Sequence, residues 1–256
     1  MTARLYWQTE GQGSDLVLIH GWGMNGAVWQ QQLPWLADHY RVHVVDLPGY
    51  GHSGGLSAAN IEEMAYLLLE NSPDSAVWLG WSLGGLIATQ AALLAPERVN
   101  KLVTVASSPR FSAQDRWRGI KPEVLANFRH QLDDNLVATV ERFMALQAMG
   151  SPTARQDIRL LKDAVLSRPA PDPAALATGL QMLADIDLRE QLAAIHQPWL
   201  RLYGRLDGLV PMKSADDIDM LAPRSQRQTF ASASHAPFIS HPEEFFQRLR
   251  EFMEES

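Results

Sequence analysis

The chain of 256 residues contains no cysteine. This absence excludes a disulfide framework, a thiol nucleophile and a thiolate metal site. The chain also lacks any apolar run close to the roughly 20 residues that a membrane-spanning helix needs. Residues 1–7 lack the apolar core of a signal peptide and instead predict a strand. These absences predict a cytoplasmic protein that does not associate with a membrane.

The chain also lacks an excess of positive charge, because 22 basic and 29 acidic residues give a formal net charge of −7. This balance argues against nucleic acid as the main partner. The charges are unevenly distributed, since residues 110–185 carry 10 basic and 9 acidic side chains. The middle of the chain therefore differs electrostatically from the rest. The length suits one sizeable α/β core.

The most informative motif is Gly-Trp-Ser-Leu-Gly at residues 80–84, which follows the apolar residues 76–79 and precedes residues that suit a helix. This order is typical of a nucleophile elbow, a tight turn between strand and helix that strains Ser82 and projects its Oγ above the sheet. Side chains at Gly80 and Gly84 would collide with the neighbouring strand or helix. The following helix directs its N-terminal amides and positive dipole end at the same point. The motif predicts Ser82 as a nucleophile.

A nucleophilic serine needs a base and an acid that orients the base. Residues 198–203 predict a buried strand, and the loop after it carries Asp207. Residues 229–234 lead in the same way to His235. Both side chains follow strands, where ligands bind in open parallel sheets. The order Ser, Asp, His therefore predicts a catalytic triad of Ser82, Asp207 and His235.

The third part of such a site is an oxyanion hole. Residues 15–19 predict a strand that ends in His20 and a Gly-Trp-Gly loop. The backbone N–H groups of Trp22 and Leu83 are predicted to form the hole. We expect His20 to brace this loop rather than to act in catalysis. Asp46 precedes Ser82 in the chain, which does not fit the triad order, so its loop is expected to support the site.

The first 109 residues alternate predicted strands and helices, which favours right-handed crossovers and a mostly parallel sheet. From about Phe111 the pattern changes to helices without strands between them, and the alternation returns near Pro198. An all-helical insertion between strands is typical of a cap over an active site. The prediction is a core of residues 1–110 and 186–256 and a cap of residues 111–185. The helices expected in the cap span residues 122–132, 135–149, 153–167 and 174–184.

Two surfaces of the predicted cap have two interpretations each. Leu136, Val140, Phe143 and Gln147 share one helical face, which is expected to pack against the core at least in part. The alternative is that Phe143, Met144 and Gln147 line a substrate slot above Ser82. Basic residues form the second surface. They either make a solvated face neutralised by neighbouring aspartates or attract an acidic helical partner. The basic residues are Arg142, Arg155, Arg159 and Lys162, and the neighbouring aspartates are Asp157 and Asp163.

These motifs together resemble the α/β-hydrolase superfamily, in which helices flank a mostly parallel central sheet. The resemblance spans nearly the whole chain and rests on residues 20–23, 46–53 and 80–84 together with Asp207 and His235. The chain also resembles the biotin-synthesis carboxylesterases that act on pimeloyl methyl ester carried on acyl-carrier protein. This narrower resemblance rests on residues 80–85, 105–109, 119–122, 141–143, 145–147, 202–204, 206–211 and 235–242.

The resemblance implies a serine carboxylesterase that releases methanol and pimeloyl-carrier protein, without a metal or an organic cofactor. It also implies acyl-carrier protein as the partner and a monomer that binds neither nucleic acid nor membrane. The acyl slot is assigned on the same basis to a short stretch of the second cap helix beside the nucleophile. The substrate-binding residues expected are Trp22, Ser82, Leu83, Phe143, Met144, Ala145, Leu146 and Gln147.

Other functions remain open from the sequence. A generalist carboxylesterase for short or medium chains, or an acyl-thioesterase, would share every catalytic residue and differ only in the fit of the cap. A C–C hydrolase would need polar groups for a dianionic substrate, and a haloalkane dehalogenase would need aspartate at position 82. A ligand-binding receptor on a hydrolase scaffold would be excluded only by turnover, because the fold alone cannot choose among these functions.

Overall fold

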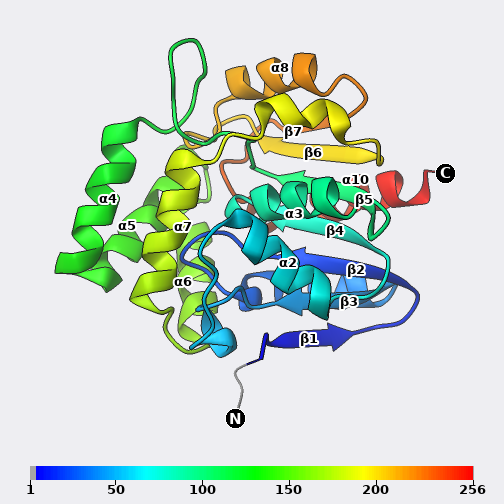
Figure 1. The fold of residues 1–256 in the computed structure, drawn as a ribbon, viewed down its shortest axis with the longest axis horizontal. Coiled ribbons are helices and arrows are strands. Elements are labelled where there is room, and N and C mark those ends of the chain that lie inside the picture. Colours follow the sequence, from blue (N-terminus) through cyan, green and yellow to red (C-terminus); the bar gives the residue numbers. More distant parts are fainter. Residues whose placement is uncertain (1–3, 256) are drawn as a thin grey trace.

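The computed structural model describes residues 4–255 apart from the side chain of Asp133. Within these residues a seven-stranded sheet runs in the order β1-β3-β2-β4-β5-β6-β7 (Figure 1). Only β1 is antiparallel to its neighbour, so the predicted mostly parallel sheet is confirmed for the described chain. The strands are β1 (Trp7–Glu10), β2 (Ser14–Ile19), β3 (Tyr40–Val45), β4 (Ala76–Trp81), β5 (Val99–Val105), β6 (Trp199–Gly204) and β7 (Gln226–Phe230).

The first strand begins later than predicted. The sequence predicts a strand over residues 1–7, but β1 begins at Trp7, which pairs with Val45. The carbonyl of Tyr6 still accepts the N–H of Asp46 (3.1 Å), but the N–H of Tyr6 donates to Ser53 Oγ (2.8 Å), so the ladder with β3 does not continue before Trp7. Residues 1–3 lie outside the described part of the chain.

Helices outside the cap complete the core. The helix α3 follows β4 and packs against β4 and β5, and it is buried almost along its whole length. An apolar sequence around the full circumference of α3 accounts for that burial. The other helices are α1 (Leu33–Ala37), α2 (Ile61–Asn71), α8 (Met212–Leu221), α9 (Pro237–Ser240) and α10 (Pro242–Glu254), with α3 at Leu83–Leu94 and the 3-10 helices η1 (Gly26–Trp29), η2 (Gly51–Ser53) and η3 (Arg189–Ala194).

Four helices lie between β5 and β6 in the sequence and are called the cap here. They are α4 (Pro122–Asp134), α5 (Leu136–Ala148), α6 (Ala154–Leu166) and α7 (Pro173–Asp185). All four predicted cap helices are confirmed to within two residues at each end. Proline occupies the first position of α4 and of α7, where its missing N–H costs no hydrogen bond. The cap lies beside the edge of the sheet at which the parallel strands end (Figure 1). The boundaries of the cap as a separate domain stay a prediction.

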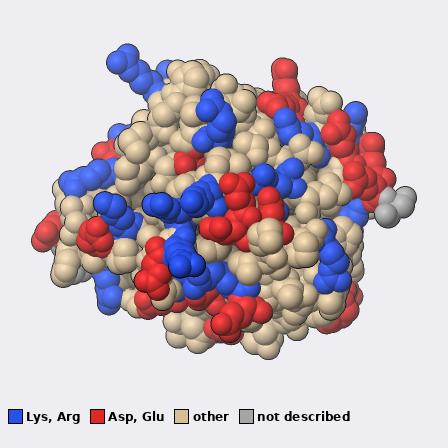
Figure 2. All heavy atoms as spheres, turned by 90° about the horizontal axis from the view of Figure 1, so that it is seen from above, with Lys and Arg blue, Asp and Glu red and all other residues tan. Residues whose placement is uncertain are grey.

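The surface carries mixed charge. Figure 2 shows the molecule from above the view of Figure 1, with Lys and Arg side chains lying among Asp and Glu side chains on this face. Near α8, Arg189 pairs with Asp187 and Arg227 pairs with Asp216, with N···O distances of 2.6 Å in both pairs. No helix in residues 4–255 is long and apolar enough to cross a membrane.

Candidate active site

The structure brings the three predicted triad side chains into one hydrogen-bonded chain. Ser82 Oγ lies 2.9 Å from His235 Nε2, and His235 Nδ1 lies 2.7 Å from Asp207 Oδ2. The three residues come from three different loops, each of which follows a strand of the sheet. All are buried, since their exposed fractions are 1% for Ser82, 5% for Asp207 and 0% for His235. This is the geometry that transfers a proton from a serine hydroxyl to an imidazole.

The backbone at Ser82 is strained in the way the elbow motif predicts. Its φ of 56° lies in the left-handed region, which β-carbon sterics disfavour. A Cβ on Gly80 would collide with the carbonyl of Gly84, and one on Gly84 would lie 2.5 Å from the carbonyl oxygens of Ile19 and His20. The predicted need for glycine at both positions is therefore confirmed.

A hydroxyl that sequence reasoning missed supports the same turn. Ser107 Oγ donates to the carbonyl of Ser82 (O···O 2.8 Å), which also accepts the N–H groups of Gly85 and Leu86. Ser107 comes just after β5, behind Ala106, whose φ is 46°. Two signals in the sequence could have identified it, namely its position after a strand end and its place in residues 105–109 of the narrower resemblance.

Asp207 is held by its own loop. Its Oδ1 accepts the N–H groups of Leu209 (2.8 Å) and Val210 (3.1 Å), which leaves Oδ2 for His235. Because the Nδ1–H of His235 donates a hydrogen bond to Asp207, the neutral imidazole presents the lone pair of Nε2 to the hydroxyl of Ser82. The loop after β6 thus determines which nitrogen of His235 faces the serine.

The two amides predicted for the oxyanion hole belong to residues close to Ser82. Leu83 is the next residue, and Trp22 follows Gly21, where an added Cβ would lie 3.2 Å from Ser82 Cβ. In residues 4–255 neither the N–H of Trp22 nor that of Leu83 donates a hydrogen bond to the protein. The Trp22 side chain points to the cap, since its indole N–H donates to the carbonyl of Leu176 (2.8 Å).

His20 braces two loops beside the site, as expected. Its Nδ1–H donates to the carbonyl of Gly21 (2.8 Å), and its Nε2 accepts the N–H of Leu47 (3.0 Å). Burial lowers the pKa of His20 to about 4, although the carboxylate of Asp46 opposes this shift. The imidazole is therefore neutral at pH 7 and holds both loops as a donor and an acceptor.

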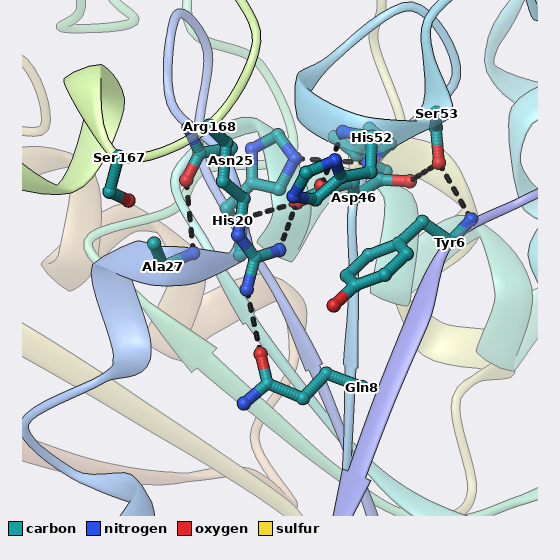
Figure 3. Close-up of polar contacts among 12 residues, drawn as sticks. Tyr6, Gln8, His20, Asn25, Ala27, Asp46, His52, Ser53, Ser167 and Arg168 are labelled. Atoms are coloured by element: carbon teal, nitrogen blue, oxygen red, sulfur yellow. Dashed lines mark hydrogen bonds and ion pairs between the residues drawn. The ribbon is translucent and has the colours of Figure 1, made fainter.

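Asp46 forms a buried network that joins the core to the cap (Figure 3). Its carboxylate accepts the N–H groups of Gly26 (2.7 Å) and His52 (2.8 Å) and pairs with Arg168 Nη1 (2.7 Å). Arg168 lies between α6 and α7 and also donates to Gln8 Oε1 (2.7 Å). Sequence reasoning missed Arg168, because its partner Asp46 is 122 residues away and no local pattern connects them.

Only some of the predicted acyl-slot residues on α5 are buried. Phe143 packs against Trp22 (ring centroids 4.7 Å apart) and against Phe128 (5.4 Å). Met144 and Gln147 are also buried, whereas Ala145 is exposed and Leu146 is half-buried. The side-chain oxygen and nitrogen of Gln147 have no hydrogen-bond partner within the described residues.

The four basic residues predicted to dock a carrier are all exposed, but they are not equally free. Lys162 pairs with Glu141 (2.5 Å), and Arg159 lies 3.8 Å from Asp163. Arg142 donates to Gln131 Oε1 (2.7 Å), and Arg155 forms no ion pair with any side chain that the structure describes.

Asp157 does not neutralise this surface, contrary to one interpretation of the sequence. It is buried and accepts the Ser151 hydroxyl (2.8 Å). Across the part of the chain that the structure describes, no group of three His, Asp or Glu side chains is placed to hold a metal ion.

Comparison with known proteins decides the family. The model of the alpha/beta hydrolase fold family matches residues 16–242 of this chain. This chain belongs to the α/β-hydrolase family. The hydrolase is 74% identical over 253 residues to a pimeloyl-(acyl-carrier protein) methyl ester esterase from Photobacterium profundum, covering 99% of this chain and 100% of the relative. It is 64% identical to a protein of the same name from Aliivibrio fischeri, covering 99% and 98% of the two chains.

Solved structures agree with the fold. An esterase from Exiguobacterium antarcticum superposes with a TM-score of 0.86 at 23% identity, covering 98% of the hydrolase and 96% of the esterase. A thermophilic esterase from Thermogutta terrifontis superposes with a TM-score of 0.83 at 26% identity, covering 97% and 92% of the two chains. The predicted fold class and the predicted membership of a hydrolase family are both confirmed.

Proposed function

We propose that this hydrolase is a serine carboxylesterase that acts on pimeloyl methyl ester carried on acyl-carrier protein. The products are methanol and pimeloyl-carrier protein for biotin synthesis. The observation that carries the proposal is the hydrogen-bonded chain from Ser82 through His235 to Asp207. The substrate follows from relatives of this name that are 58–74% identical over nearly the whole chain.

In the proposed mechanism His235 is the general base. Its Nε2 removes the proton of Ser82 as Oγ attacks the ester carbonyl, while Asp207 stabilises the imidazolium that forms. The same imidazolium then protonates the departing methoxide. Water, deprotonated by His235, hydrolyses the acyl-enzyme and frees Ser82. No step needs a metal or an organic cofactor.

The oxyanion of each tetrahedral intermediate is proposed to bind the amides of Trp22 and Leu83. Both N–H groups are free of protein acceptors in the described residues, so they can donate to the developing charge without breaking a bond. One such donor is typically worth about 3 to 4 kcal/mol of transition-state stabilisation. The positive end of α3 adds to the same potential, because Leu83 is its first residue.

The acyl chain is proposed to lie between Trp22 and α5. Phe143 and Met144 offer it an apolar wall, and the amide of Gln147 offers it a polar contact. We also propose Ser82 and Leu83 as contacts at the ester end. Ala145 and Leu146 belong to the same helix turn and support this wall through the backbone. Such a slot would admit the distal methyl ester first and keep the thioester away from Ser82.

The carrier is proposed to dock on the basic cap surface of Arg142, Arg155, Arg159 and Lys162. An acidic helical protein would be attracted to this surface, and the attraction would decrease with added salt. Arg155 supports the proposal best, because it forms no ion pair with the side chains that the structure describes. That the enzyme binds neither nucleic acid nor membrane also remains an expectation from the sequence. The cytoplasmic location and the monomeric state remain expectations from the sequence.

Mass spectrometry of the carrier tests this function. Methyl pimeloyl-carrier protein is incubated with the wild-type enzyme and, in parallel, with Ser82→Ala. We expect the wild type to convert the methyl ester to the acid while the thioester stays intact, and the variant to be inert. Release of the acyl chain from the carrier would instead identify an acyl-thioesterase. No reaction with the carrier, together with turnover of simple esters, would leave a generalist carboxylesterase.

A further inference from the structure

The main chain of His235 is hydrogen-bonded on both sides to distant parts of the sequence. Its N–H donates to the carbonyl of Gln147 in the cap (N···O 3.1 Å). Its carbonyl accepts the indole N–H of Trp81 (N···O 2.8 Å). Trp81 is the last residue of β4 and directly precedes Ser82. The backbone of His235 is therefore connected to the strand that carries Ser82.

The indole of Trp81 has a fixed orientation. It is fully buried, and its ring packs edge-on against Phe238 with centroids 5.2 Å apart. Phe238 in turn packs against Trp29 (4.3 Å). On another side, a Cβ added to Gly21 would lie 3.2 Å from the Trp81 ring, so this loop also contacts the indole. The ring cannot turn its N–H away from His235 without disturbing these contacts.

The carbonyl of His235 depends on this one donor. Within residues 4–255 no other N–H or O–H donates to it. A buried carbonyl that loses its donor is left unsatisfied. The loop after β7 could then recover a partner only by moving, and such movement would disturb the 2.9 Å contact between His235 Nε2 and Ser82 Oγ.

We propose that Trp81 is a positioning residue whose indole N–H holds the main chain of His235 in place for proton transfer. The inference rests on the proposed roles of Ser82 and His235. The hydrogen bond acts on the backbone of His235, and the indole ring also lies beside the imidazole of His235, with ring centroids 5.8 Å apart. Loss of its N–H therefore lowers the rate of ester cleavage and leaves the affinity for the ester unchanged.

The chain supplies a matched control in Trp78. It lies on the same strand three residues earlier and is also fully buried. Its indole N–H has no hydrogen-bond partner in the described structure. Trp78→Phe and Trp81→Phe remove the same atoms from the same strand, but only Trp81→Phe removes a bond to His235.

The test compares kcat, KM and melting temperature of the two variants on a small p-nitrophenyl ester. We expect Trp81→Phe to lower kcat about tenfold with KM within about twofold of the wild type, because small misplacement of a catalytic group slows the reaction strongly. Trp78→Phe keeps the wild-type kcat, although both variants melt at lower temperature. Equal kcat values for the two variants, or a change of Trp81→Phe confined to KM, would overturn the proposal.

A second variant removes the donor without removing volume. β-(3-Benzothienyl)alanine in place of Trp81 keeps the shape of the bicyclic ring but has sulfur where the indole has N–H. We expect this replacement to lower kcat about as much as Trp81→Phe does at position 81 and to leave kcat unchanged at position 78. A wild-type kcat after the replacement at position 81 would overturn the proposal, even if Trp81→Phe does not fold. The assay on the small ester needs no carrier protein, so a wrong carrier assignment would leave this result unaffected.

Discussion

The proposed reactive residues follow strands of the sheet, whereas the proposed acyl slot and carrier surface lie on helices of the cap. Ser82 comes from β4, which is hydrogen-bonded to strands on both sides. The cap helices satisfy most of their backbone bonds internally and join the core through contacts of individual residues along their length, such as Phe143 with Trp22. Those contacts include Arg168 with Asp46 and the Trp22 indole with Leu176. The core can therefore hold reactive geometry that is independent of which side chains the cap presents.

This difference separates two kinds of change. Substitutions in the core loops should reduce hydrolysis of every ester, because they alter the bonds of Ser82, His235 or Asp207. Substitutions in the cap should change which ester is preferred or how firmly the cap is attached. Four changes test this separation, beginning with the one of largest expected effect.

Ser82→Ala should abolish turnover of small and carrier-bound esters alike. We expect kcat to fall by a factor on the order of 10⁶, as for loss of a triad nucleophile, with an unchanged melting curve. Ser232→Ala is the control, since Ser232 is exposed on the loop that leads to His235. A Ser82→Ala enzyme that retained a hundredth of the wild-type kcat would contradict the assignment.

Arg168→Met should loosen the cap. It leaves the fully buried carboxylate of Asp46 without its cation, and breaking such a pair typically costs about 3 to 5 kcal/mol in free energy of unfolding. Denaturant unfolding measures the loss, and limited proteolysis should find faster cleavage in residues 122–185. Adding Asp46→Asn removes the unpaired charge, so the double variant should lose less than the two single losses added together. Simple additivity would argue against a coupled pair.

The stability of the enzyme should fall with acid through His20. In the folded protein the imidazole of His20 takes up a proton only near pH 4, whereas in the unfolded chain it does so near pH 6.5. Between these values the unfolded chain binds more protons, so the free energy of unfolding decreases as the pH is lowered, by about 3 kcal/mol in total. In denaturant unfolding, the His20→Asn variant should be less stable than the wild type at pH 7. Its free energy of unfolding should also depend less on pH. The exposed His39→Asn should keep the wild-type slope; equal slopes in all three proteins would disprove the role of His20.

Phe143→Ala should change the preferred chain length. The truncation removes the ring that packs against Trp22 and Phe128, and we expect the preference in kcat/KM for medium over short acyl esters to fall about tenfold. Phe245→Ala is the control, because Phe245 is equally buried but lies on α10 in the core. Identical ratios in the two variants would argue that Phe143 only stabilises the fold.

The sequence predicted local features well, because neighbouring residues determine them. The Ser82 turn requires two glycines at fixed spacing, and prolines or polar caps mark where α4, α5 and α7 begin. Contacts between distant segments were not predictable in the same way. Arg168 meets Asp46 across 122 residues, and Trp81 meets His235 across 154. Helical rotation likewise turns Ala145 outward between Met144 and Gln147, although the resemblance treats residues 143–147 as one group.

The most direct test of the division between core and cap is the charge reversal Arg155→Glu on α6. It is compared with Lys213→Glu, which makes the same charge change at an exposed position of α8 in the core. We measure kcat/KM for methyl pimeloyl-carrier protein and for free methyl pimelate at low salt. We expect Arg155→Glu to lower kcat/KM for the carrier-bound ester about tenfold and to leave kcat/KM for the free ester unchanged. Lys213→Glu should not show this selective loss. Equal losses on both substrates, or the same result from Lys213→Glu, would contradict this division.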